Sequence, residues 1–167
     1  MFSPDAYLLP NLITIGRILL IPLFLYFLLT IQPVFAAVLF LLLSLTDALD
    51  GFLARKLGQI SDLGKFLDPI ADKILVISAL IGLVEIRFIP ALPVILIVAR
   101  DFIVSAVRLS AAKEGQVIAA SPWGKVKTVL QVLAVFMLIL NLPYAIPVLW
   151  FAVLLTLVSG VDYLVRR

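Results

Sequence analysis

The sequence predicts an all-α integral membrane protein, a bundle of six transmembrane helices, and three observations support this fold class. Of the 167 residues, 64% are hydrophobic and only 14% are charged, whereas about 25% of an average soluble domain is charged. The mean hydropathy is +1.24. Two uncharged stretches, at 18–46 and 128–161, exceed the length of about 20 apolar residues that crosses a bilayer. This composition excludes a soluble globular domain and a disordered chain, which needs low hydrophobicity and high charge.

Prolines and neighbouring polar residues divide the apolar stretches into spans. Gln32-Pro33 interrupts the uncharged run at 18–46, and the segment from Asn141 to Pro147 interrupts the run at 128–161. The uncharged runs between them are too short to cross a bilayer alone, so their helices must include flanking charged residues. We predict one domain over residues 1–167, with spans at about 12–31, 34–54, 66–86, 90–111, 124–141 and 146–165.

The charged residues predict the orientation of this bundle. An even number of spans places both termini on one side of the membrane, and of the 13 basic residues only Arg87 falls on the other side. Lys and Arg accumulate in cytoplasmic loops. We therefore expect the termini and the charged loops on the cytoplasmic face of the inner or plasma membrane. The working site should lie there too, because 16 of the 23 charged residues fall at 47–73 and 100–127.

Four aspartates are the candidate chemical groups. The chain has no Cys and no His, which excludes a thiolate or imidazole metal site and a Ser-His-Asp triad. Asp47 and Asp50 are three residues apart and Asp68 and Asp72 are four apart, so each pair lies on one face of a helix. Consecutive helices joined by a short loop are usually neighbours. We therefore expect the four carboxylates to share one pocket.

Four carboxylates in one pocket predict a site for divalent cations, because unpaired carboxylates would repel one another. Oxygen ligands favour Mg²⁺, Mn²⁺ or Ca²⁺, and two such ions are a recurrent arrangement in phosphoryl transfer. Gly51, Ala54 and Gly64 are small enough to let a ligand approach, and Arg55 could bind a phosphate. Two other interpretations remain open: structural ion pairs, and the cation pathway of a transporter.

The segment from Asp47 to Asp72 reads DALDGFLARKLGQISDLGKFLDPIAD. It resembles the signature of the CDP-alcohol phosphatidyltransferase family, D-x2-D-G-x2-A-R-x8-G-x3-D-x3-D, and meets every fixed position. The resemblance implies a six-helix membrane fold and transfer of a phosphatidyl group from CDP-diacylglycerol to an alcohol, with release of CMP. It also implies roles for the matching residues. The metal ligands would be Asp47, Asp50, Asp68 and Asp72, with Asp72 also the catalytic general base, and the CDP-binding residues would be Asp47, Asp50, Gly51, Ala54, Arg55 and Gly64.

Looser matches resemble one branch of the family, the phosphatidylglycerophosphate synthases. They are the segment from Pro10 to Arg17, the residues around Arg100-Asp101, the run from Gly124 to Thr128, and Ser159-Gly160. This branch implies glycerol 3-phosphate as the acceptor, a lipid bilayer as the surroundings, a Mg²⁺ or Mn²⁺ cofactor and a homodimer. Other acceptors, as in cardiolipin, phosphatidylserine or phosphatidylinositol-phosphate synthases, remain open.

A phosphorylated acceptor needs cations of its own. Arg100 and Arg108 on the fourth helix, with Lys125 and Lys127 at the start of the fifth, predict a basic pocket for the acceptor phosphate. The lysines could instead be ordinary positive-inside flanking residues, and Asp101 could pair with Arg108. Two further groups have open assignments. Asn11, Thr14 and Arg17 border the CDP site or have a capping or interfacial role, and Ser159-Gly160 is better explained by close helix packing than by substrate contact.

Overall fold

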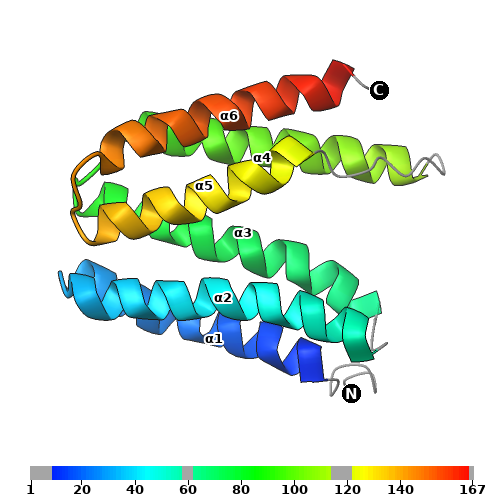
Figure 1. Cartoon of the computed structure of the whole chain (residues 1–167), viewed down its shortest axis with the longest axis horizontal. Coiled ribbons are helices and arrows are strands. Elements are labelled where there is room, and N and C mark those ends of the chain that lie inside the picture. Colours follow the sequence, from blue (N-terminus) through cyan, green and yellow to red (C-terminus); the bar gives the residue numbers. More distant parts are fainter. Residues whose placement is uncertain (1–8, 58–61, 114–121, 166–167) are drawn as a thin grey trace. The chain divides into compact units, whose positions relative to one another are not determined.

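The computed structural model describes residues 9–57, 62–113 and 122–165, with side chains at 13–46, 70–71, 73–107, 110 and 126–161. This part of the chain forms six α-helices and no strand (Figure 1). The helices are α1 (Leu9–Leu29), α2 (Pro33–Leu57), α3 (Asp62–Glu85), α4 (Ala91–Lys113), α5 (Pro122–Ile139) and α6 (Ala145–Val165).

Each predicted span corresponds to one of these helices, so the all-α fold class with six helices is confirmed. Within the described residues, no helix is both long enough and apolar enough to cross a membrane.

Prolines mark where the helices begin. Pro33 and Pro122 are the first residues of α2 and α5. At this position proline costs nothing, because the first N–H groups of a helix have no partner within it and the fixed φ of proline suits the helix. Pro22, in contrast, lies inside α1 without ending it. The helix break that was predicted at Gln32-Pro33 is confirmed, because α2 begins at Pro33.

Helices α1 and α5 end in the same way. After α1, the N–H of Gln32 donates to the carbonyl of Phe27 at 2.9 Å, and Ile31 has a positive φ of 55°. After α5, the N–H of Leu142 donates to the carbonyl of Met137 at 2.9 Å, and Asn141 has a φ of 51°. This is the Schellman motif, which satisfies the last carbonyls of a helix with one residue in the left-handed region.

The contacts divide the chain into two compact units, residues 1–86 and 87–167. The first contains α1, α2 and α3, each of which packs against the other two. Phe24 of α1 and Phe40 of α2 form its centre, with ring centroids 5.7 Å apart. Gly82 of α3 lets α1 come close, since a Cβ there would lie 2.7 Å from Leu28 Cδ2.

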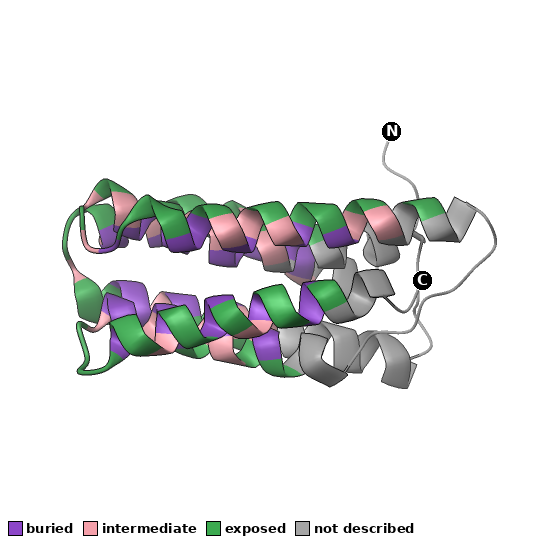
Figure 2. Cartoon of the chain, turned by 90° about the horizontal axis from the view of Figure 1, so that it is seen from above, coloured by how far each residue is buried: buried purple, intermediate pink, exposed green. Residues whose placement is uncertain are grey.

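In the second unit, α6 packs against both α4 and α5. Its apolar core includes Ile97, Val135, Leu138 and Leu149, all almost completely buried. Figure 2 shows that buried residues form stripes along the helices, while exposed residues occupy the other faces. The single domain predicted over residues 1–167 stays a prediction.

Candidate functional site

The described backbone of the aspartate signature is helical, at 47–57 and at 62–72. Asp47 and Asp50 lie in the last part of α2, and Asp68 and Asp72 lie in the first part of α3. The two helices are in contact, and Figure 1 shows the end of α2 beside the start of α3. The prediction of a shared pocket assumed that each pair of aspartates lies within a helix, and the backbone is helical at both pairs.

The side chains of the signature lie outside the described residues. They are Asp47, Asp50, Gly51, Ala54, Arg55, Gly64, Asp68 and Asp72. Among the described residues, no group of three or more acidic side chains could hold a metal ion. The donor set of the signature nevertheless suits Mg²⁺ or Mn²⁺, because four carboxylates on two adjacent helices supply only hard oxygen ligands. The metal site and the residue roles stay predictions.

Helix α1 carries two buried polar side chains near its start, at the end of the first unit where the aspartate signature also lies. Thr14 is completely buried and Arg17 is only 2% exposed, and both make polar interactions. They continue the buried stripe of Ile21, Phe24 and Leu28, at alternating spacings of three and four residues. A buried guanidinium is stable only where its charge is compensated.

Thr14 was predicted to border the CDP site, and its burial on the inner face of α1 is compatible with that position. Arg17, like Thr14, was predicted from the sequence to border the nucleotide site or to have a capping or interfacial role, and this assignment stays a prediction. The spacing of three and four residues from the apolar stripe of α1 is the signal that could have indicated its burial. The side chain of Asn11 lies outside the described residues.

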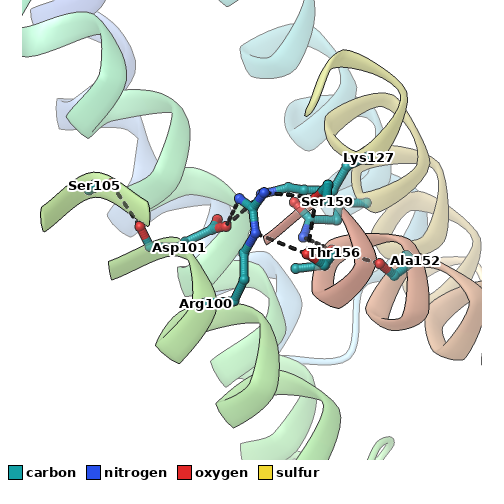
Figure 3. Close-up of polar contacts among 8 residues, drawn as sticks. Arg100, Asp101, Ser105, Lys127, Ala152, Thr156 and Ser159 are labelled. Atoms are coloured by element: carbon teal, nitrogen blue, oxygen red, sulfur yellow. Dashed lines mark hydrogen bonds and ion pairs between the residues drawn. The ribbon is translucent and has the colours of Figure 1, made fainter. Parts of the chain in front are cut away.

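A second group of polar residues lies between α4, α5 and α6 (Figure 3). Arg100 of α4 extends toward α6, where its Nε donates to the Thr156 carbonyl at 2.9 Å and its Nη2 donates to Ser159 Oγ at 2.7 Å. Its Nη1 donates to Asp101 Oδ1 at 3.1 Å. Three of the five N–H donors of this guanidinium are thus fixed by the fold.

Asp101 joins two cations from different helices. The same oxygen, Oδ1, accepts from Arg100 Nη1 and from Lys127 Nζ of α5, the latter at 2.5 Å. Lys127 is only 6% exposed and Asp101 is 9% exposed. Ion pairs shielded from water in this way are screened much less by salt than surface pairs. Asp101 therefore ties α4 to α5 electrostatically.

Hydroxyl and amide groups complete this network. The Thr156 hydroxyl donates to the Ala152 carbonyl at 2.6 Å and accepts from Gln131 Nε2 at 3.1 Å. Ser159 Oγ donates to the Thr156 carbonyl at 3.0 Å. Buried polar networks of this kind are stable when their members are hydrogen-bonded.

Gly160 provides the space in which Arg100 lies. A Cβ at this position would be 3.0 Å from Arg100 Cγ and 3.2 Å from its Nε. The prediction of close helix packing at Ser159-Gly160 is confirmed, because these residues receive a side chain of α4. Small residues of this type commonly let helices approach in membrane proteins.

The structure therefore brings together two of the four residues predicted to bind the acceptor phosphate. Arg100 and Lys127 meet on Asp101, whereas the side chains of Arg108 and Lys125 lie outside the described residues. Asp101 pairs with Arg100 and Lys127, and its predicted pairing with Arg108 stays a prediction. Sequence reasoning named Gln131 only as part of the looser family resemblance, and it missed Thr156. The polar character of Thr156 inside an apolar helix was the available signal.

Comparison with known proteins identifies the same family that the aspartate signature resembles. Residues 7–158 match the family model described as CDP-alcohol phosphatidyltransferase. A Bacillus subtilis protein named CDP-diacylglycerol–glycerol-3-phosphate 3-phosphatidyltransferase is 42% identical, over 93% of this chain and 92% of its own length. A Haemophilus influenzae protein of the same name is 39% identical, over 93% and 91%. A probable phosphatidylglycerophosphate synthase of Mycobacterium tuberculosis H37Rv is 38% identical, over 95% and 80%.

Proposed function

Because the chain belongs to the CDP-alcohol phosphatidyltransferase family, we propose that it transfers the phosphatidyl group of CDP-diacylglycerol to glycerol 3-phosphate, which gives phosphatidylglycerophosphate and CMP. The observation that carries this proposal is the complete aspartate signature on the adjoining parts of α2 and α3. Relatives named for this reaction, similar over nearly the whole chain, support it.

The signature residues would divide the chemistry among them. Asp47, Asp50 and Asp68 would hold Mg²⁺ or Mn²⁺, together with Asp72. When bound, two such ions would neutralise the diphosphate of the donor and the charge that develops on the departing CMP. Asp72 would accept the proton of the acceptor hydroxyl as its oxygen attacks the phosphorus. The acceptor oxygen would form a bond to the phosphorus of the phosphatidyl group. The bond from that phosphorus to the oxygen of the CMP phosphate would break.

The nucleotide would be bound beside these carboxylates. Gly51, Ala54 and Gly64 would leave room for the CDP moiety, and Arg55 would pair with a phosphate oxygen. Asn11 and Thr14 would border the same site from α1, which packs against both α2 and α3. The burial of Thr14 supports this arrangement.

The acceptor would be bound by cations of the second unit. Glycerol 3-phosphate carries a phosphate dianion that needs positive charge apart from the metal site. Arg100 and Lys127 supply two cations within one hydrogen-bonded cluster, and Arg108 and Lys125 would add to them. Arg is suited to bind phosphate through two parallel N–H groups, and Lys through a compact charge.

We also propose that the six helices span the membrane, with the site at the cytoplasmic face. Large apolar side chains are exposed on the described parts of all six helices, among them Leu23, Val38, Phe102, Val129 and Phe151. Exposed apolar surface of this extent is typical of surfaces covered by lipid or protein. The donor supports the same setting, because its acyl chains are soluble only in lipid. A homodimer is implied by the family resemblance alone.

A panel of acceptors tests the proposed reaction. Purified protein in detergent micelles is given CDP-diacylglycerol, Mg²⁺ or Mn²⁺ and one acceptor at a time, and CMP release is measured. We expect release with glycerol 3-phosphate. Release only with serine, inositol phosphate or phosphatidylglycerol would overturn the acceptor and leave the family activity intact. Ion flux in vesicles without CMP release would favour the transporter interpretation.

A further inference from the structure

We infer that Arg17 is the counter-cation of the aspartate site: its buried guanidinium compensates the carboxylates of Asp47 and Asp72 and positions them before metal ions bind. This inference rests on the proposed function, because it assumes that these two aspartates are metal ligands. It goes further, since it gives a role in metal binding to a residue that cannot itself hold a metal ion.

The burial of Arg17 is the first support. Arg17 is the only charged residue of α1, it is 2% exposed, and it makes a polar interaction within the protein. A guanidinium buried to this extent is strongly unfavourable unless an anion compensates its charge. Because α1 contains no acidic residue, we expect that anion on another helix of the first unit.

The packing of α1 on α2 places Arg17 and Asp47 at one level. The two helices are antiparallel (Figure 1), and Phe24 of α1 lies against Phe40 of α2 with the ring centroids 5.7 Å apart. Arg17 lies seven residues before Phe24, toward the start of α1. Asp47 lies seven residues after Phe40, toward the end of α2. Each residue advances either helix by about 1.5 Å, so Arg17 and Asp47 are level.

The packing of α1 on α3 gives the matching level on the third helix. These two helices are parallel (Figure 1), and a Cβ at Gly82 of α3 would lie 2.7 Å from Leu28 Cδ2 of α1. Arg17 lies eleven residues before Leu28. Eleven residues before Gly82 is Ala71, which directly precedes Asp72. Arg17 is therefore level with one aspartate of each pair.

The buried faces of the three helices lead to the same place. On α2, Leu43 is buried, and Asp47 follows it by four residues. On α3, Leu75 is buried, and Asp72 precedes it by three residues. Residues three or four apart lie on one face of a helix. The helical period thus places Asp47 and Asp72 on faces that are buried within the unit, as Arg17 is on α1.

A guanidinium at this place has two effects on the carboxylates. When no metal is bound, it reduces the repulsion among four negative charges, and its rigid fork of N–H donors fixes the direction of carboxylate oxygens. Its positive charge also opposes the entry of a divalent cation, which must share the same carboxylates. Arg17 therefore stabilises the metal-free site and weakens metal binding.

Three roles of Arg17 predict different results when its charge is removed. Loss of a counter-cation would destabilise the metal-free protein and tighten metal binding. Loss of packing alone would lower the stability by the same amount with and without metal. Loss of a group that binds the donor diphosphate would weaken the binding of CDP-diacylglycerol, and metal binding without the donor would stay unchanged.

The test measures Mn²⁺ binding and thermal unfolding of wild-type protein, Arg17→Met and the control Arg87→Gln, in detergent and without substrate. Arg17→Met removes the charge and keeps a long side chain, and Arg87→Gln removes one positive charge from an exposed position after α3. For Arg17→Met we expect the dissociation constant of Mn²⁺, followed by electron paramagnetic resonance of the free ion, to fall at least about tenfold, the effect that a neighbouring opposite charge has on a carboxylate. Its unfolding temperature should fall in chelator, and Mn²⁺ should raise that temperature by more than in the wild type. Arg87→Gln should match the wild type in both measurements, because an exposed and distant charge is screened.

A double variant keeps the inference falsifiable if Arg17→Met does not fold. Arg17→Met combined with Asp47→Asn removes one carboxylate together with the cation, so it should be more stable in chelator than Arg17→Met alone. Arg17→Lys keeps the charge and should bind Mn²⁺ with nearly wild-type affinity. Mn²⁺ binding that is unchanged or weaker in Arg17→Met, or a double variant that is no more stable than Arg17→Met, would overturn the inference alone. Wild-type protein that binds no Mn²⁺ would overturn the metal site of the proposed function, and the inference with it.

Discussion

Arg100 is fixed by contacts along its whole side chain. Its aliphatic part lies against Gly160, and three of its N–H groups donate to Thr156, Asp101 and Ser159. A side chain held at so many points cannot move aside easily. Gly160, which lies against this side chain, should therefore tolerate no increase in size.

Glycine-to-alanine variants measure this constraint. Gly160→Ala places a Cβ 3.0 Å from Arg100 Cγ, whereas Gly16→Ala meets nothing within 4 Å. In a helix, alanine is favoured over glycine by about 1 kcal/mol, so Gly16→Ala should raise the unfolding temperature in detergent. Gly160→Ala should lower it, because overpacking costs about 1–3 kcal/mol. Stabilisation of equal size in both variants would show that Arg100 is free to move.

The proposed general base gives a second prediction for a single residue. Asp72→Asn keeps the shape of the side chain but removes its ability to take a proton, so CMP release should fall by about 10²–10⁴-fold. Binding of CDP-diacylglycerol, measured separately, should change far less. An Asp72→Asn protein with most of the wild-type kcat would contradict the assignment.

Contacts within a single helix or motif could be predicted from the sequence, and contacts between distant helices could not. Asp47 and Asp50 were placed on one helix face because their spacing fixes their direction. The partners of Asp101 depend on how α4, α5 and α6 rotate and pack against one another. Helical phase along α4 suggested Arg108, a pairing that stays a prediction, but it could not indicate Lys127, which lies on another helix 26 residues away in the chain. Hydropathy contains no information on such a pairing.

The two Schellman motifs differ in the residue that adopts the positive φ. Asn141 after α5 suits the left-handed region, because its side chain can form local hydrogen bonds there. Ile31 after α1 has a φ of 55°, which is unusual for a β-branched residue. The end of α1 therefore contains backbone strain that the end of α5 lacks.

Glycine at these positions should reveal the difference. Ile31→Gly should raise the free energy of unfolding by about 1–2 kcal/mol, the cost of the left-handed region for an ordinary residue. Asn141→Gly, at the same position of the same motif, should change the free energy of unfolding much less than Ile31→Gly does. Unfolding in detergent, followed by circular dichroism, measures both. Equal effects in the two variants would contradict the assignment of strain to Ile31.

The helices themselves were predictable to within four residues at each end. Long apolar runs indicate where a helix must be, and prolines such as Pro33 and Pro122 indicate where one begins. The extension of α3 back to Asp62 was not predicted. Hydropathy places a boundary at the first charged residues, but hydrogen bonding can continue a helix through them.

The absence of cysteine from the chain allows a clean test of membrane placement. Single cysteines are introduced at Asn141, Ser110 and Val129, three exposed positions on different parts of the molecule. A membrane-impermeant maleimide should label Asn141→Cys in intact cells, and Ser110→Cys only after the membrane is made permeable. Val129→Cys should stay unlabelled in both cases, because lipid would cover it.

Two results would contradict the proposed placement. Labelling of Ser110→Cys, but not Asn141→Cys, in intact cells would reverse the orientation that the basic residues predict. Labelling of Val129→Cys as readily as of the other two would show that water, not lipid, covers this face of α5.

The central claim is that the carboxylates of α2 and α3 form a metal-dependent phosphatidyl-transfer site. The most direct measurement is CMP release from CDP-diacylglycerol and glycerol 3-phosphate, first with divalent cations removed by a chelator and then with Mg²⁺ or Mn²⁺ restored. We expect the wild-type protein to lose activity and regain it with the metal, and Asp68→Asn to stay at least about 100-fold less active at saturating metal, because one ligand is missing. Full activity of the wild-type protein in chelator, or full activity of Asp68→Asn, would contradict the claim.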